Sequence, residues 1–304
     1  MIDQFQSLPK LRSGASREIF FERGTYSVGI WQMWQKPTWA KMVHLMAIGS
    51  GSSGAGGASR ASLGPAAAGG GGGACSGFQT LLIPALFLPQ TCYILIGVGG
   101  AATPAGSAGF AGQNTIISSV NRSTSGAAMI LRANGGGQPN GAVIATTTGP
   151  GGIAGSLGNM TTTVIGASGH NNAVISLAGQ DGAAGTTLSD VQPLQGNMLC
   201  GGAGGGGTSA GQNDFIAGGG IASLGIIPAI PGGAGGTGGN GQNGFWSWAP
   251  MCGTGGSGGG NNPTGTGGNG GDGASGCGGG GGGQGITGGR SGKGGGGFAI
   301  ITCW

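Results

Sequence analysis

Residues 231–241 read PGGAGGTGGNG and residues 267–273 read GGNGGDG, so two of every three positions in these stretches are glycine. A period of three fits neither an α-helix nor a β-strand, whose side-chain periods are 3.6 and 2. It fits an extended helix with three residues per turn, which has no internal hydrogen bonds and leaves its backbone available for lateral bonding. Collagen shares the period, but its other two positions are rich in proline, which is nearly absent from these runs.

Several glycine runs of one chain can pack side by side because, without Cβ atoms, their backbones approach closely enough for N–H to C=O bonds in several directions. Each bond contributes about 0.5–1.5 kcal/mol net, whereas ordering the backbone of one residue costs about 1–2 kcal/mol. The margin is thin, so we expect a β-sheet region to anchor the runs. The alternative is that the runs are flexible linkers.

The composition favours an ordered chain. Of 304 residues, 83 are glycine and only 6% are charged, whereas an ordinary domain has about 7% glycine and roughly 25% charged residues. Abundant glycine without a strict period is typical of disorder, but disordered chains are normally charged and poor in aliphatic residues. Here 37% of the residues are hydrophobic, and runs such as 41–48 and 81–88 would not stay soluble if exposed.

The expected fold class is mainly β, with polyglycine II-like segments and little or no α-helix. Residues 41–48 carry apolar side chains on both alternating faces, which indicates a buried strand. Residues 78–98 predict two strands around a turn at Leu88-Pro89-Gln90 rather than a membrane span, because prolines and polar residues interrupt them. Further short strands are expected at 22–28, 115–120, 127–132, 142–147, 161–165 and 173–177.

Four parts are expected along the chain. Residues 1–22 are polar and mixed in charge, which is typical of a docking segment. Residues 23–199 form a β-rich domain with glycine-rich loops, and residues 200–297 form the glycine-rich lattice. Residues 298–304, FAIITCW, are predicted to return as a strand and pair with the N-terminal strands.

Charge and chemistry point away from several function classes. The net charge of +4 is too dilute for a nucleic-acid binder. Metal binding is not expected, because the cysteines include no closely spaced pair; they fit buried free thiols of a protein made in a bacterial cytoplasm, with a disulfide left open. His44 and His170 have no recognisable catalytic partners, so neither a cofactor nor enzyme activity is expected. The six cysteines are Cys75, Cys92, Cys200, Cys252, Cys277 and Cys303.

Two groups of aromatic and apolar residues are candidate contact sites. Phe245, Trp246 and Trp248 interrupt glycine-rich sequence, and loop aromatics are typical recognition anchors. The competing interpretation is that they plug one end of the lattice or pack on a neighbouring subunit. Ile226 and Ile227 belong to a second apolar loop of the same kind.

The second aromatic group is predicted to be core or subunit interface. It comprises Trp31, Trp34 and Trp39, which lie close together in the sequence. The chain has little apolar area per residue, which favours burial between subunits and therefore a homo-oligomer.

The order of several motifs resembles the glycine-rich tail and fibre proteins of bacteriophages. Those proteins carry a Gly-Thr-Tyr strand, an aromatic turn with proline, and an apolar strand that runs into polyglycine. An Ile-Pro…Leu-Pro strand pair and a Val-Gly-x-Gly-Gly turn follow, and four glycines with a short apolar strand ending in Trp close the chain. The matching residues here are Gly24-Thr25-Tyr26, Trp34-Gln35-Lys36-Pro37, 41–51, Ile83-Pro84, Leu88-Pro89, Gly97-Val98-Gly99-Gly100 and 294–304.

The resemblance implies a virion location, other virion proteins as partners, and contact with a host cell-surface receptor like that of phage adhesins with stacked polyglycine helices. The chain departs from the family in its less glycine-rich middle, residues 115–200, and in an N-terminal segment that matches no known attachment motif. A capsid decoration or head fibre is the alternative location. An ice-binding protein is a remote alternative, which would need a regular face of Thr or Ala, whereas Ala234, Thr237 and Asn240 vary.

Overall fold

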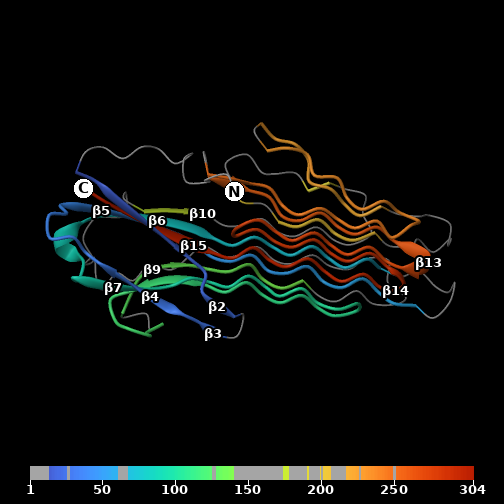
Figure 1. Ribbon diagram of the computed structural model, residues 1–304, viewed down its shortest axis with the longest axis horizontal. Coiled ribbons are helices and arrows are strands. Elements are labelled where there is room, and N and C mark those ends of the chain that lie inside the picture. Colours follow the sequence, from blue (N-terminus) through green and yellow to red (C-terminus); the bar gives the residue numbers. More distant parts are fainter. Residues whose placement is uncertain are drawn as a thin grey trace.

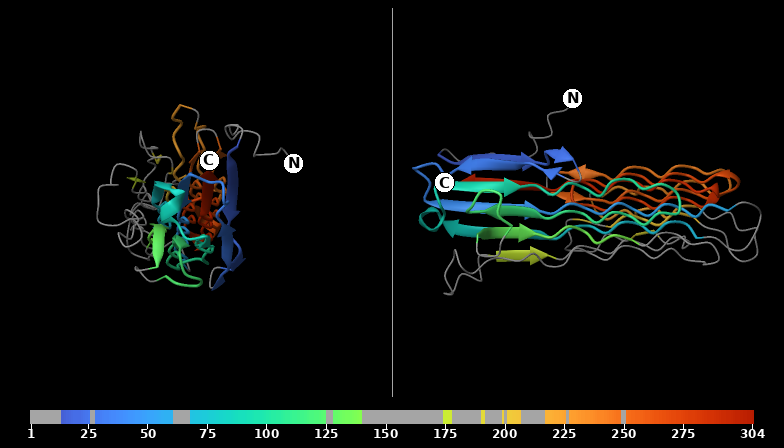
Figure 2. Two further views of the ribbon diagram at one scale, coloured as in Figure 1. Left: turned by 90° about the vertical axis from the view of Figure 1, so that its left-hand side faces the viewer. Right: turned by 90° about the horizontal axis from the view of Figure 1, so that it is seen from below.

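The structure is a computed structural model that describes residues 14–25, 28–60, 68–124, 128–139, 174–177, 190–191, 199, 201–206, 217–225, 227–248 and 251–304. It is mainly β, and its described residues include no α-helix, which confirms the expectation of a mainly β fold with little or no α-helix. The strands of the two largest sheets lie toward one end of an elongated body, and long undulating runs extend side by side from them (Figures 1 and 2).

The strands fall into two main sheets and three two-stranded pairs. The five-stranded sheet has the order β1-β15-β5-β6-β10 and the four-stranded sheet the order β4-β7-β8-β9. All neighbours within these two sheets are antiparallel. The strands are β1 (Ser16–Phe21), β2 (Gly24–Thr25), β3 (Val28–Gly29), β4 (Trp31–Gln35), β5 (Met42–Ile48), β6 (Phe78–Pro84), β7 (Thr91–Leu95), β8 (Thr115–Ser118), β9 (Met129–Ala133), β10 (Val174–Leu177), β11 (Trp246–Ser247), β12 (Cys252–Gly253), β13 (Asn262–Thr266), β14 (Gly285–Thr287) and β15 (Phe298–Cys303).

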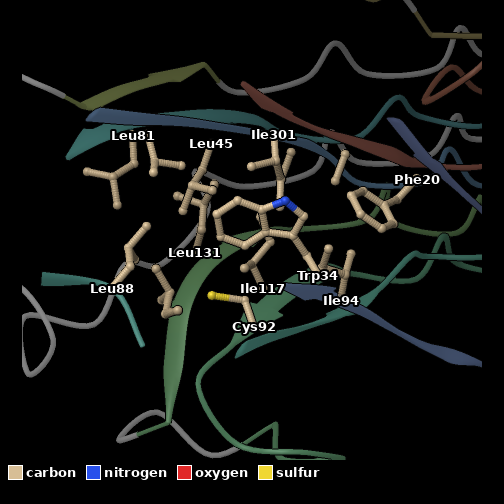
Figure 3. Packing of buried hydrophobic residues seen from close by; sticks show 14 of the residues in the cluster. Phe20, Trp34, Leu45, Leu81, Leu88, Cys92, Ile94, Ile117, Leu131 and Ile301 are labelled. Carbon is tan, nitrogen blue, oxygen red and sulfur yellow. The ribbon is translucent and has the colours of Figure 1, made fainter. Parts of the chain in front are cut away.

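The two main sheets pack face to face as a sandwich around one apolar core (Figure 3). Trp34, which is 1% exposed, lies in the middle of it, with Leu45 and Ile301 from one sheet and Ile117 from the other. Burying an aliphatic side chain of this size stabilises the fold by about 1.5–3 kcal/mol. The sandwich therefore supplies the hydrophobic anchor that the glycine runs need.

The strand β5 shows why this sequence forms a buried strand. Val43, Leu45 and Ala47 alternate into the sandwich core, while Met46 and Ile48 face a second apolar cluster on the opposite side of the sheet. Apolar residues on both faces fit a strand that is covered on both sides, as the sequence predicted.

Most of the expected strands are present. Residues 78–98 form β6 and β7, joined through a short 3₁₀ turn at Ala85–Phe87. The predicted strands near 115, 129 and 174 correspond to β8, β9 and β10. The expected strands at 142–147 and 161–165 lie outside the described residues, as do Tyr26, His170 and Cys200.

The expected N-terminal docking segment requires a correction. Residues 16–21 are not a separate polar segment but the edge strand β1, paired along its length with β15. Phe20 enters the sandwich core, and charged residues such as Arg17 and Glu18 are typical of an edge strand. Residues 1–13 lie outside the described residues. The C-terminal β15 lies between β1 and β5, so it does pair with N-terminal strands.

The glycine lattice comprises the laterally bonded runs 49–60, 68–77, 96–114, 134–139, 201–206, 217–220, 231–245 and 253–297. The expected boundary at residue 200 is therefore wrong, because runs from both halves of the sequence bond to one another. The reason is that strands continue directly into glycine runs. Strand β5 passes into 49–60 and run 288–297 passes into β15 (Figure 1).

The run 279–284 is at the centre of the lattice. Each of its N–H groups donates to, and each of its C=O groups accepts from, another run, with N···O distances of 2.7–2.9 Å. The partners repeat every third residue, as a helix with three residues per turn requires. The six neighbouring runs contain residues 52–55, 70–73, 203–206, 259–262, 268–271 and 289–292.

Close approach explains why residues 279–283 of the central run are all glycine. A Cβ atom added at Gly280, Gly281 or Gly283 would overlap a carbonyl group of Ser257, Gly70 or Gly260 respectively. Because the obstacle is backbone rather than a movable side chain, no rotamer change relieves it. Six surrounding runs leave no direction in which a side chain could point.

Serine replaces glycine inside the lattice where a backbone amide needs another acceptor. Ser50, Ser52 and Ser53 are fully buried. The Oγ of Ser52 accepts from the amide of Ala74 at 2.7 Å, and the Oγ of Ser53 accepts from the amide of Phe110 at 2.8 Å. A buried amide without a partner would cost about 1–3 kcal/mol, so these hydroxyls complete the bonding where carbonyls do not.

Candidate functional site

The aromatic loop at 245–248 packs where the five-stranded sheet passes into the lattice. Trp248 is 7% exposed, and its ring lies 5.4 Å from Trp246 and 5.3 Å from Phe298. Phe21 meets Trp248 edge to face at 5.9 Å. These contacts fix the loop against the sheet, and they leave the ring of Trp248 inaccessible to a partner.

The remaining residues of the two apolar loops lie in different environments. Phe245 packs against a small cluster that includes Val191 and Ile221. Ile227 is largely buried and bonds through its backbone to Leu224, while Ile226 lies outside the described residues. Of the four described residues expected to form a contact site, Trp248 and Ile227 are buried and Phe245 and Trp246 are half-buried, so these four do not form one exposed surface.

The three N-terminal tryptophans lie in three different environments. Trp34 is in the sandwich core. Trp39 is 50% exposed in the turn that follows Lys36-Pro37. Trp31 is half-buried on the outer face of the four-stranded sheet. These three residues are close in the sequence but not in one environment. Strand alternation places Trp31 and Trp34 on opposite faces of β4, and Trp39 lies in a turn.

A hollow of about 600 Å³ opens on the outer face of the four-stranded sheet. Its volume lies within the range of ligand pockets, about 300–1,000 Å³. It is lined by residues 29–33 together with Tyr93, Asn121 and Arg122. Sequence reasoning missed this site, although the odd spacing between Trp31 and Trp34 indicates that their side chains leave opposite faces of one strand.

Strand register explains which side chains reach the hollow. Met33 lies directly opposite Tyr93 in the pairing of β4 with β7. Their neighbours Trp34 and Cys92 face the sandwich core, so Met33, Tyr93 and Trp31 face outward. Met33 is 56% exposed, which leaves an apolar surface open to solvent.

Arg122 lines the hollow from the turn between β8 and β9. Its φ is 55°, in the left-handed region that few non-glycine residues adopt. Such a conformation costs on the order of 1–3 kcal/mol and often marks a functional position. The guanidinium makes no hydrogen bond or ion pair in the part of the chain that the structure describes, and no residue lining the hollow is acidic.

The buried titratable groups favour neutral, unreactive forms. Burial raises the pKa of the Cys92 thiol to about 12 and also raises the pKa of Cys252. The five described cysteines are all buried, and no disulfide joins any two of them. Among the described residues, no group of three or more His, Cys, Asp or Glu side chains is placed to hold a metal ion.

The outward side chains of the glycine triplets form ladders on the lattice surface. The side-chain oxygen of Asn240 accepts from the amide of Asn269 at 2.9 Å, and Asn269 accepts in the same way from the amide of Arg290. Each side chain therefore satisfies the outward amide of the next run. The adjacent ladder comprises Asn243, Asp272 and Lys293.

Comparison with known proteins gives no match to a family model and none to a curated protein. No helix within the described ranges is both long and apolar enough to cross a bilayer.

Proposed function

We propose that this chain is a non-enzymatic structural protein of a bacteriophage particle, carried at or near the tail or tail fibre, with polyglycine II helices as its glycine runs. The observation that carries the proposal is the run 279–284, bonded to six neighbouring runs. Bending such a body would break many lateral bonds at once, so it is stiff along its length. Stiffness suits a spacer or shaft, and the resemblance of the sequence to glycine-rich phage tail proteins supports the same role.

The sandwich end is the proposed attachment point to other virion proteins or to further copies of the chain. Two turns lie there, one that begins at Lys36-Pro37 and the 3₁₀ turn at Ala85–Phe87. Lys36 Nζ joins them by donating to the carbonyls of Ala85 at 2.6 Å and Leu88 at 2.7 Å. Contiguous exposed apolar surface commonly marks an interface. The exposed apolar side chains of these turns are Trp39, Leu86 and Phe87.

The outward triplet side chains count against the ice-binding alternative. Along the ladders, Asn, Asp, Arg and Lys occupy the positions where a regular Thr or Ala face would be needed. A thermal-hysteresis assay on the purified chain is therefore expected to show no activity.

Locating the chain in the intact particle tests the proposal. Electron microscopy of virions carrying a tagged chain is expected to place the tag on the tail. A tag on the head would favour the decoration or head-fibre alternative over the tail location, and absence from purified particles would overturn the virion role. Host contact is tested separately, by asking whether the purified protein reduces phage adsorption; no competition at saturating dose would remove the receptor role.

A further inference from the structure

We propose that the hollow on the outer face of the four-stranded sheet binds a saccharide that carries a carboxylate. The proposal rests on the proposed function for its biological meaning, since a host surface polysaccharide would supply such a ligand. The binding itself is a property of the isolated chain and can be tested without the phage.

The apolar part of the hollow fits the face of a sugar ring. Trp31 and Tyr93 come from neighbouring strands and line it together with Met33. The face of an aromatic ring is electron-rich, so it attracts the weakly positive C–H groups that cover one side of a pyranose. Ile30 and Met33 are 50% and 56% exposed, so this surface is available without any movement of the fold.

The polar part of the hollow selects an acidic ligand. Arg122 supplies a guanidinium with no partner among the described residues, and Asn121 beside it supplies an amide. A guanidinium matches a carboxylate with two parallel hydrogen bonds. Because no lining residue is acidic, the hollow carries a positive charge that an acidic ligand would complement.

The backbone at Arg122 provides an independent reason to assign it a role. At a φ of 55°, glycine would be accommodated without strain. No hydrogen bond or ion pair explains a long cationic residue at this position, since its guanidinium makes neither with the described residues. It is explained if the turn serves to present the guanidinium to a ligand.

A concave site with an unpaired charge fits a small anionic ligand better than a second copy of the chain. The apolar side chains that line it would suit a protein partner as well, but burying the guanidinium of Arg122 without an acid would be costly. Occupation by a second copy is therefore the alternative outcome of the test.

Calorimetric titration of the full chain with oligogalacturonate and with N-acetylneuraminic acid tests the proposal, with galactose as the neutral probe. We expect an acidic probe to bind and galactose to bind at least tenfold more weakly. Arg122→Gly is expected to weaken binding of the acidic probe at least tenfold without lowering the thermal unfolding midpoint. Trp31→Ala is expected to weaken binding too, whereas Trp39→Ala, at an exposed tryptophan outside the hollow, leaves it unchanged.

Three results would overturn the proposal. One is the absence of binding by both acidic probes at millimolar concentration, and another is binding that survives both Arg122→Gly and Trp31→Ala. The third is a dimer in sedimentation that the same two variants dissociate, which would make the hollow a subunit interface. If the chain is found on the tail and blocks adsorption while no acidic saccharide binds, the saccharide proposal fails and the virion role stands.

Discussion

The sandwich and the glycine lattice exclude water by opposite means. Between the two sheets, large side chains such as Trp34 and Leu45 fill the space. Around residues 279–283, neighbouring backbones fill it and a Cβ atom would overlap a backbone carbonyl. The difference shows that a protein can build a dry interior from hydrogen-bonded backbone alone, provided that a conventional core holds the ends of the runs in place.

The largest expected loss of stability comes from adding one methyl group to the centre of the lattice. Gly281→Ala places a Cβ against the carbonyl of Gly70, and relief would require two runs to separate and lose their bonds. We expect a loss of more than about 5 kcal/mol in the free energy of unfolding, which is exceptional for one substitution. Urea unfolding, together with the soluble yield, measures it.

Two matched variants separate backbone overlap from ordinary crowding. Val43→Ile adds one carbon to the buried sandwich core and is expected to cost about 1–3 kcal/mol, as overpacking usually does. Gly265→Ala meets only the side-chain amide of Asn262, which can move away. Equal losses for Gly281→Ala and Val43→Ile would contradict a lattice made of closely packed backbone.

A smaller effect distinguishes the interior of the lattice from its surface. Ser52→Ala removes the buried acceptor for the amide of Ala74 and is expected to cost about 1–3 kcal/mol, the penalty for an unsatisfied buried group. Asn240→Ala removes an acceptor of the same kind at an exposed position, where water replaces it. Its expected effect is within about 0.5 kcal/mol.

Urea unfolding of the Ser52→Ala and Asn240→Ala variants measures the loss in the free energy of unfolding for each. If the two substitutions destabilise the protein equally, the hydroxyl of Ser52 does not act as a buried acceptor. The serines would then be tolerated small residues rather than part of the bonding.

The glycine triplets and the alternating apolar strands made the fold class predictable from the sequence. Residues 231–241 and 267–273 show the period of three openly, and 41–48 shows the buried strand. The lattice role of 49–60 was not predictable in the same way, because serine and alanine interrupt its glycines. Those residues are accommodated by partners far along the chain, such as the amide of Ala74 for Ser52.

The candidate sites were less predictable because they depend on contacts between distant segments. The burial of Trp248 follows from Phe298 and Phe21, which are remote in sequence. The outward position of Trp31 follows from the phase of β4 relative to the core, which Trp34 sets. The left-handed φ of Arg122 has no local signal, since glycine or asparagine would be the usual residue there.

The smallest expected effect is a pH dependence that arises in the sandwich at His44, whereas residues 278–283 at the centre of the lattice are all glycine and carry no titratable group. Burial, and then the charge of Arg17, lower the pKa of His44 from its ordinary value of 6.5. Arg17 lies two strands away across Thr302, to whose hydroxyl it donates. The folded state therefore favours neutral His44, while the unfolded chain takes up a proton near its ordinary pKa.

The sign of the pH effect follows from this difference. The contribution of neutral His44 is fully present above about pH 6.5 and is lost as the pH falls from there through the lower pKa of the folded state. Unfolding midpoints at pH 7.5, 6.5 and 5.5 are expected to fall more steeply for the parent than for His44→Gln, in which His170 and every carboxylate are unchanged. Parallel slopes would mean that His44 titrates alike in both states, and the pH sensitivity assigned to the sandwich would then belong to other groups.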